Sequence, residues 1–125
     1  MDYGLNKFGE GTGVYARPAD APLAPSETQI VNAIIKAVRK AYPESIVVKI
    51  HGGGFQKAGI PDLYIAVMGI NLWVEVKRPG GDTTALQKRF LESLRLNGIP
   101  CGTAESPERV LSMIEQTLHL YDEHY

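Results

Sequence analysis

The stretch GIPDLYIAVMGINLWVEVKRPGG, from Gly59 to Gly81, decides the fold of this chain. It contains two apolar runs, Leu63–Met68 and Leu72–Val76, that are rich in β-branched and aromatic residues. Such runs are typical of strands. The residues between them, Gly69-Ile70-Asn71, predict a tight turn. The sequence therefore predicts an antiparallel hairpin.

Three ionisable residues interrupt this apolar pattern: Asp62 at the start of the first run, and Glu75 and Lys77 in the second. Strand residues two apart point to the same face, so Glu75 and Lys77 share one side. If Gly69-Ile70 forms a two-residue type II′ turn, position 62 falls opposite position 77. Asp62 then lies on the face of Glu75, at a diagonal distance of roughly 7–8 Å. A register shifted by one residue would move Asp62 to the other face.

Two carboxylates and an ammonium at the end of a buried hairpin are costly unless a ligand neutralises the acids. Mg²⁺ prefers oxygen ligands and keeps several waters, and a bound ion can clamp a phosphate and activate water. Glu-Val-Lys alone is common on a solvated strand, and Pro-Asp alone is a turn. Gly-x-Pro-Asp followed after twelve residues by Glu-x-Lys and Arg-Pro-Gly-Gly is much more specific. We therefore expect a metal site rather than a solvated face.

These residues carry a family resemblance. Pro61-Asp62 and Glu75-Val76-Lys77 match the pattern that names the PD-(D/E)XK nucleases. More narrowly, the chain resembles the VRR-NUC (virus-type replication-repair nuclease) domain, in which a Gly-x-Pro-Asp strand, a Trp-x-Glu-x-Lys strand and a Gly-rich turn precede a helix with a glutamine. The matching segments here are Gly59–Asp62, Trp73–Lys77, Pro79–Gly81 and Gln87. The resemblance covers roughly Ser26 to Gln116 and implies a restriction-endonuclease-like core.

The resemblance also implies an activity, a Mg²⁺- or Mn²⁺-dependent endonuclease that hydrolyses DNA phosphodiesters. Asp62, Glu75 and the backbone carbonyl of Val76 would hold the metal. Lys77 would orient the attacking water and stabilise the charge that grows on the phosphate.

Two further site residues have a local alternative. Glu27 lies three and four residues before Ile30 and Val31, so we expect it to point along the buried face of the first helix. The resemblance implies that it is a third carboxylate at the metal; the alternative is a first-turn acid favoured by the helix dipole. The resemblance likewise places Gln87 near the active site as a catalytic residue, although Thr84-Ala-Leu-Gln87 also reads as a capping box.

The remaining elements follow from periodicity and caps. Capping signals at Ser26, Thr84 and Ser106 each predict the start of a helix. The helix that starts at Thr84 is expected to end near Asn97. Its core-facing residues should be Leu86, Phe90 and Leu94. Apolar runs predict strands at 46–50 and 99–104. The order α-β-β-β-α-β-α predicts an α/β fold, one mixed sheet flanked by helices. The step from the Glu75 strand to the last strand should be a right-handed parallel crossover.

Charge is distributed unevenly. The chain has 125 residues, enough for one domain, and its net charge is −1. Between Lys36 and Arg95, however, there are ten Lys and Arg residues and only five Asp and Glu residues. A basic excess around the candidate site suits DNA. The expected DNA contacts are His51, Lys57, Arg78, Lys88 and Arg89.

Residues 1–25 are rich in Gly and Pro and lack periodicity, so we expect an N-terminal arm, flexible or dimer-docking, before a nuclease domain over 26–125. Its apolar side chains could dock on a partner (Tyr3, Leu5, Phe8, Val14 and Tyr15). Small VRR-NUC proteins resemble Holliday-junction resolvases, which act as two-fold dimers, and this implies a homodimer that prefers branched DNA.

The alternative is a non-catalytic nucleic-acid-binding or assembly module with a vestigial site, although the intact set of Asp62, Glu75 and Lys77 speaks against it. No apolar run approaches the ~20 residues of a membrane span, and no signal peptide is evident. The single cysteine, Cys101, is expected to be a buried thiol. We therefore expect a cytoplasmic, soluble protein of phage or bacterial type, without an organic cofactor.

Overall fold

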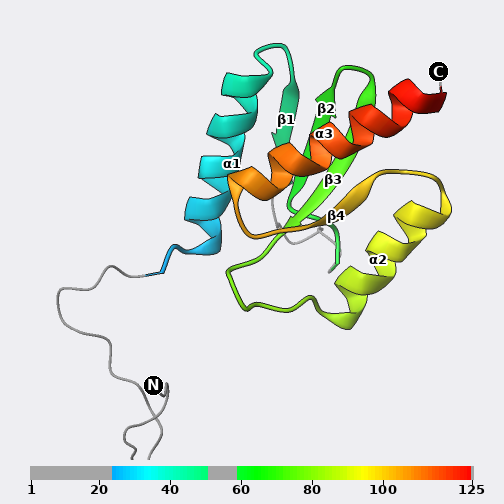
Figure 1. The fold of residues 1–125 in the computed structure, drawn as a ribbon. Helices are drawn as coiled ribbons and strands as arrows, with labels where there is room; N and C mark the ends of the chain where they lie inside the picture. The colour runs from blue at the N-terminus through cyan, green and yellow to red at the C-terminus, as the bar shows by residue number, and fades with distance from the viewer. Residues whose placement is uncertain (1–23, 51–58, 125) are drawn as a thin grey trace, which may run out of the picture.

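The computed structural model describes residues 24–50 and 59–124. Its elements follow the predicted order α-β-β-β-α-β-α (Figure 1). They are α1 (Glu27–Ala41), β1 (Ile46–Lys49), β2 (Leu63–Val67), β3 (Ile70–Val76), α2 (Ala85–Leu96), β4 (Cys101–Ala104) and α3 (Pro107–His124).

The four strands form one mixed sheet in the order β1-β2-β3-β4. β1 pairs with β2 and β2 with β3 in antiparallel fashion, while β3 and β4 are parallel. The parallel pair is the predicted crossover through α2. The fold class is therefore confirmed.

Side chains alternate along the strands, so the two faces of the sheet carry different residues. One face carries a closely packed core, in which the largest buried side chains include Leu63, Ile65, Leu72 and Val74. α1 and α3, which contact each other, cover this face (Figure 1). α2 packs on the other face, where the ring of Phe90 lies 6.4 Å from that of Trp73. Glu75 belongs to this second face, under the start of α2.

The helix starts are confirmed. Ser26 and Gln29 form a complete capping box at α1, and Thr84 and Gln87 form one at α2. At α3, the hydroxyl of Ser106 accepts a hydrogen bond from the backbone N–H of Arg109 at 3.2 Å. Each cap satisfies amide groups that the first helical turn leaves unpaired.

The predicted turn of the hairpin is wrong. Val67 pairs with Ile70, so the two turn residues are Met68 and Gly69, both at positive φ (48° and 87°), as a type I′ turn requires. The left-handed conformation costs Met68 about 1–2 kcal/mol. In return Ile70 joins β3 and becomes 1% exposed instead of standing in a turn. Burial of an isoleucine side chain stabilises by about 1.5–3 kcal/mol, which offsets the strained methionine.

Two expectations for side-chain burial also need correction. Leu86, expected in the core, is 47% exposed, and Leu91 is the buried residue of α2. Cys101, expected to be buried, is only partly so, and its thiol donates a hydrogen bond to the carbonyl of Leu91 at 3.3 Å. Among the described parts of the chain, no helix is long and apolar enough to cross a membrane.

Candidate active site

The corrected turn changes where Asp62 stands. Leu63 pairs with Val74, so Asp62, one residue earlier, comes directly opposite Glu75 rather than diagonal to it. The register differs from the expected one by two residues, and a shift of two keeps every side chain on its predicted face. Asp62 and Glu75 therefore share a face, as predicted, and lie nearer to each other than predicted.

Backbone contacts on both sides hold Asp62 in place. Its carbonyl oxygen accepts a hydrogen bond from the N–H of Ile50 at 2.8 Å. Its carboxylate oxygen Oδ2 accepts one from the N–H of Val76, also at 2.8 Å. Oδ2 is thus hydrogen-bonded to the neighbouring strand, and Oδ1 is the oxygen that could bind a ligand.

Glu75 is a buried carboxylate, with 2% of its surface exposed. Its two oxygens differ. Oε2 accepts a hydrogen bond from Nε2 of Gln87 at 2.8 Å and lies 3.4 Å from Nζ of Lys77. Oε1 is buried with no hydrogen-bond partner in the part of the chain that the structure describes. A buried polar atom without a partner is costly, and a cation or water bound at Oε1 would satisfy it.

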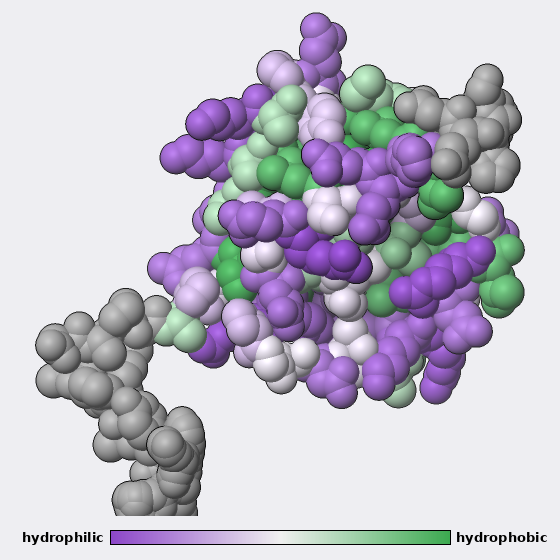
Figure 2. Space-filling view, in the orientation of Figure 1, coloured by the Kyte–Doolittle hydropathy of each residue, from purple (hydrophilic) through white to green (hydrophobic). Residues whose placement is uncertain are grey.

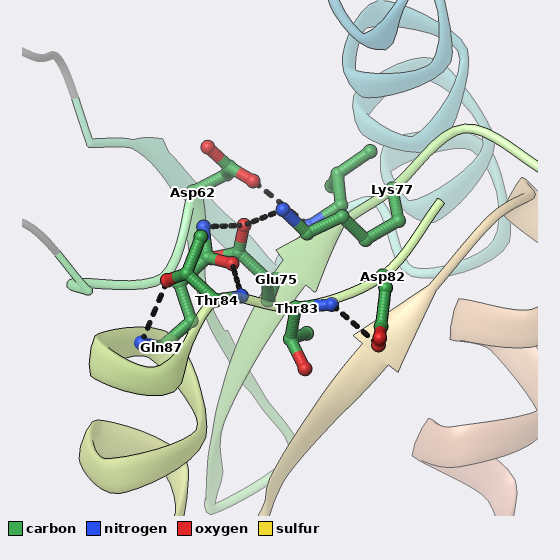
Figure 3. Close-up of polar contacts among 8 residues, drawn as sticks. Asp62, Glu75, Lys77, Asp82, Thr83, Thr84 and Gln87 are labelled. Atoms are coloured by element: carbon green, nitrogen blue, oxygen red, sulfur yellow. Dashed lines mark hydrogen bonds and ion pairs between the residues drawn. The ribbon is translucent and has the colours of Figure 1, made fainter.

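The environment of Glu75 opposes its ionisation. Burial, and then repulsion from Asp62, raise the pKa of Glu75 from 4.5 to about 7, while the ammonium of Lys77 acts in the opposite direction. A carboxyl shifted this far inside a polar cluster is typical of functional sites. Figure 3 shows the side chains of Asp62, Glu75, Lys77 and Gln87 converging where the strands end and α2 begins.

Gln87 closes the capping box and also lies against Glu75, while its catalytic role stays a prediction. Its Oε1 accepts the backbone N–H of Thr84 at 2.8 Å as the acceptor of the capping box, and its Nε2 donates to Glu75 (Figure 3). The hydroxyl of Thr84 in turn accepts the N–H of Gln87 at 3.1 Å. The cap therefore fixes the direction of the amide so that its NH₂ group faces the carboxylate. The role of Thr84 was missed, although the capping box that reveals it is visible in the sequence.

A glycine sets the distance between the Asp62 segment and α2. Gly59 has φ +99°, and a Cβ at this position would stand 2.7 Å from the backbone oxygen of Leu86. Only glycine permits this close approach. The segment that leads into Asp62 therefore rests directly on the first turn of α2, next to Gln87.

Other predicted ligands are not assembled here. Glu27 lies in the first turn of α1 and is exposed, not turned along the buried face of its helix. Within residues 24–50 and 59–124, no three or more His, Cys, Asp or Glu form a group that could hold a metal. Val76 contributes its N–H to Asp62, and its carbonyl as a ligand stays a prediction.

The predicted DNA-binding residues fall into two groups. Arg78 follows β3, and Lys88 and Arg89 lie on α2; all three are exposed. His51 and Lys57 lie outside the described residues, so their predicted roles stay predictions.

The donor atoms that do converge suit a hard divalent cation. Oε1 of Glu75 has no hydrogen-bond partner among the described residues, Asp62 lies opposite Glu75, and both side chains offer carboxylate oxygens. Mg²⁺ and Mn²⁺ prefer such ligands, and Mg²⁺ commonly takes only one or two carboxylates from the protein and fills the remaining positions with water and substrate oxygens. Two carboxylates without a third are thus compatible with a Mg²⁺ site.

Comparison with known proteins bears on the family of this chain. The sequence matches no protein-family model and no curated protein. A solved structure described as a "VRR_NUC domain" is similar, with a TM-score of 0.54 and 25% sequence identity. The similarity covers 67% of this chain and 92% of that one. The resemblance inferred from the sequence is thereby confirmed: this chain is a structural match to the VRR_NUC domain, a domain of a nuclease family.

Proposed function

We propose that the protein is a Mg²⁺- or Mn²⁺-dependent endonuclease that hydrolyses phosphodiester bonds of DNA. One observation carries the proposal: among residues 24–50 and 59–124, no group partners the buried Oε1 of Glu75, which lies on the face that also holds Asp62 and Lys77. A nuclease-family fold around this cluster adds to it.

The cation would be held by Oε1 of Glu75 and Oδ1 of Asp62, with the carbonyl of Val76 as a further ligand. Bound there, a divalent cation polarises a phosphate and lowers the pKa of a coordinated water. It would also remove the repulsion between the two carboxylates that, with burial, raises the pKa of Glu75.

The remaining residues have roles that follow from their contacts. Lys77, held beside Oε2 of Glu75 at 3.4 Å, presents an ammonium at the point where negative charge grows on the phosphate. Gln87 saturates Oε2, so that Oε1 is the oxygen directed to the ligand. Arg78, Lys88 and Arg89 are exposed near this end of the sheet and would contact the DNA backbone.

The substrate and the assembly are a further part of the proposal. We infer a homodimer that acts on branched DNA, because one chain carries one candidate site and paired incisions across a junction need two sites related by a dyad.

A cleavage panel tests the proposal. Linear duplex, flap, splayed and four-way DNA would be incubated with Mg²⁺, Mn²⁺, or chelator, using wild type and Glu75→Gln. This variant is isosteric, keeps the buried side chain and removes only the anionic ligand. We expect metal-dependent cleavage by wild type, strongest on the four-way substrate, and none by the variant.

Three outcomes would count against the proposal. Cleavage that persists in chelator would contradict metal dependence, and cleavage by Glu75→Gln would contradict the site. DNA binding without cleavage under every condition would favour the non-catalytic module instead.

A further inference from the structure

A polar groove runs along β4, the edge strand of the sheet, between α2 and α3. It consists of two adjoining hollows of about 340 and 290 Å³ that share Thr103 and Arg109 in their walls. The first hollow begins at Lys77, and the second reaches Arg95 in the last turn of α2. The groove therefore leads from the candidate active site along the outer edge of the sheet.

Charge differs between the two ends of this groove. Near Lys77 the walls also contain Asp82 and Glu105, which balance the cations. Asp82 points away from the Asp62–Glu75 cluster and accepts the N–H of Thr83 at 2.8 Å (Figure 3).

At the far end the walls contain Arg95 and Arg109 and no carboxylate. Within the described residues, neither guanidinium forms a salt bridge. Arg95 also acts on the neighbouring Cys101: burial raises the pKa of this thiol, and the charge of Arg95 counters part of that effect. Arg109, which lines both hollows, and Arg95 thus lie one after the other along the edge strand, and Arg95 adds an exposed cation beyond the neutral section.

The surface around the groove is hydrophilic. Figure 2, drawn in the orientation of Figure 1, shows mostly purple and white residues where β4 runs between α2 and α3. The neutral section also offers hydroxyls, from Thr83, Thr103 and Ser106. Hydroxyls can bond to sugars and base edges, whereas arginines bind phosphates.

We propose that this groove seats one DNA strand next to the scissile phosphate, with Arg109 and Arg95 contacting its phosphates in turn. The inference rests on the proposed nuclease function and adds to it a path for the substrate. The four residues of β4 span roughly 13 Å, the length of a few nucleotides. Hollows of about 340 and 290 Å³ are too small to enclose a duplex and suit a single strand. An extended polyanion fits a narrow channel with spaced cations better than a compact ligand does.

The test measures binding without cleavage. A labelled duplex, with and without a single-stranded tail of six nucleotides, is titrated by fluorescence anisotropy in EDTA at several salt concentrations. The proteins are wild type, Arg95→Ala, Arg109→Ala, the double variant, and Lys40→Ala as control. Lys40 lies in the last turn of α1, is exposed, and does not line the groove, yet its loss changes the net charge equally.

We expect the tail to strengthen binding to wild type and to Lys40→Ala by the same factor. Each arginine variant should lose part of this gain, and its salt dependence on tailed DNA should fall by about 0.7 units of slope per lost contact. The double variant should bind tailed and untailed DNA alike. Tailed DNA should also slow alkylation of Cys101, the single cysteine of the chain, which lines the groove.

Several results would overturn the inference. One is that the tail does not strengthen binding to wild type. Another is that the salt dependence of binding to tailed DNA is the same for the double variant as for wild type. Unaltered alkylation of Cys101 under saturating tailed DNA is a third. A fall in molecular mass of the arginine variants by light scattering would make the groove a contact between copies instead. Failure of wild type to bind any DNA would count against the proposed function itself, while melting curves establish that each variant is folded.

Discussion

Nε2 of Gln87 donates a hydrogen bond to Oε2 of Glu75 at 2.8 Å, so the first turn of α2 and the third strand of the sheet meet at a single buried carboxylate. The same glutamine closes the capping box of its helix through Oε1. One side chain therefore links helix formation to the state of the candidate site.

This double role allows the two contacts of Gln87 to be separated by mutation. Gln87→Glu keeps an acceptor for the capping box but replaces the donor with a second anion against Glu75. We expect the helix to keep its cap, the melting temperature to fall because two carboxylates repel each other, and cleavage to fall on the order of 10- to 100-fold, the usual effect of losing a group that orients a metal ligand. Initial rates of plasmid nicking at saturating Mg²⁺ measure it. Thr84→Ala is the matched control, since it weakens the cap and leaves the donor, and full activity of Gln87→Glu would refute the role of the Glu75 contact.

Stability without metal should depend on pH through Glu75. The pKa of Glu75 is about 7 in the folded protein, and its ordinary value, which applies to the unfolded chain, is 4.5. Between these two pH values the folded protein therefore binds more protons than the unfolded chain. Stability in EDTA should therefore fall as pH rises from about 4.5 to 7 and level off above. Urea unfolding at a series of pH values measures this. Glu75→Gln should show a shallower dependence and be more stable than wild type at pH 8; an identical pH dependence of both proteins would contradict the assignment.

Metal binding should release protons for the same reason. A cation requires ionised Glu75, so its affinity should rise with pH up to about 7 and more slowly above. Calorimetry with Mn²⁺ in two buffers of different ionisation enthalpy counts the protons released. Asp62→Asn should bind Mn²⁺ weakly at every pH, and binding that is independent of pH would show that Glu75 is not a ligand.

Lys77→Ala separates chemistry from metal binding. We expect most turnover to be lost, because the ammonium near the phosphate is gone, and Mn²⁺ affinity at pH 8.5 to be unchanged or higher, because a cation beside the ion is gone. The readouts are single-turnover cleavage and calorimetry at that pH, with Lys36→Ala, an exposed residue of α1, as control. Loss of metal binding in Lys77→Ala would instead make Lys77 a structural support.

Gly59→Ala tests the contact between the Asp62 segment and α2. The added Cβ would stand 2.7 Å from the oxygen of Leu86, so α2 must move, and with it Gln87. We expect lower stability and lower cleavage together. Gly98→Ala is the control: it has a similar positive φ of 75° but nothing within 4 Å of the added Cβ, so it should cost about 1–2 kcal/mol and leave cleavage intact. If both variants lost the same stability and cleavage activity, the contact between Gly59 and Leu86 would not explain the effect of Gly59→Ala.

Much of this fold could be predicted because its signals are local. A capping box joins residues three apart, and strand alternation joins residues two apart, so Ser26, Thr84 and the shared face of Glu75 and Lys77 were all readable from the sequence. The match of Asp62, Glu75 and Lys77 to a nuclease pattern was also visible in the sequence, because that pattern is an order and spacing of residue types and needs no knowledge of packing.

The tertiary structure decided what depends on burial between distant segments. Met68 and Gly69 form the turn, and not Gly69-Ile70 as expected, because the burial of Ile70 outweighs the strain at Met68. Turn propensities are local and do not include the free energy of burying Ile70 in the core. The contact of Gln87 with Glu75 likewise depends on how closely Gly59 lets the chain approach α2. The sequence by itself determined which residues could form a site and on which face, since these follow from backbone geometry over a few residues. Only packing decided which oxygen of Glu75 is left for a ligand, because Gln87, whose hydrogen bond occupies the other oxygen, lies twelve residues away in the chain.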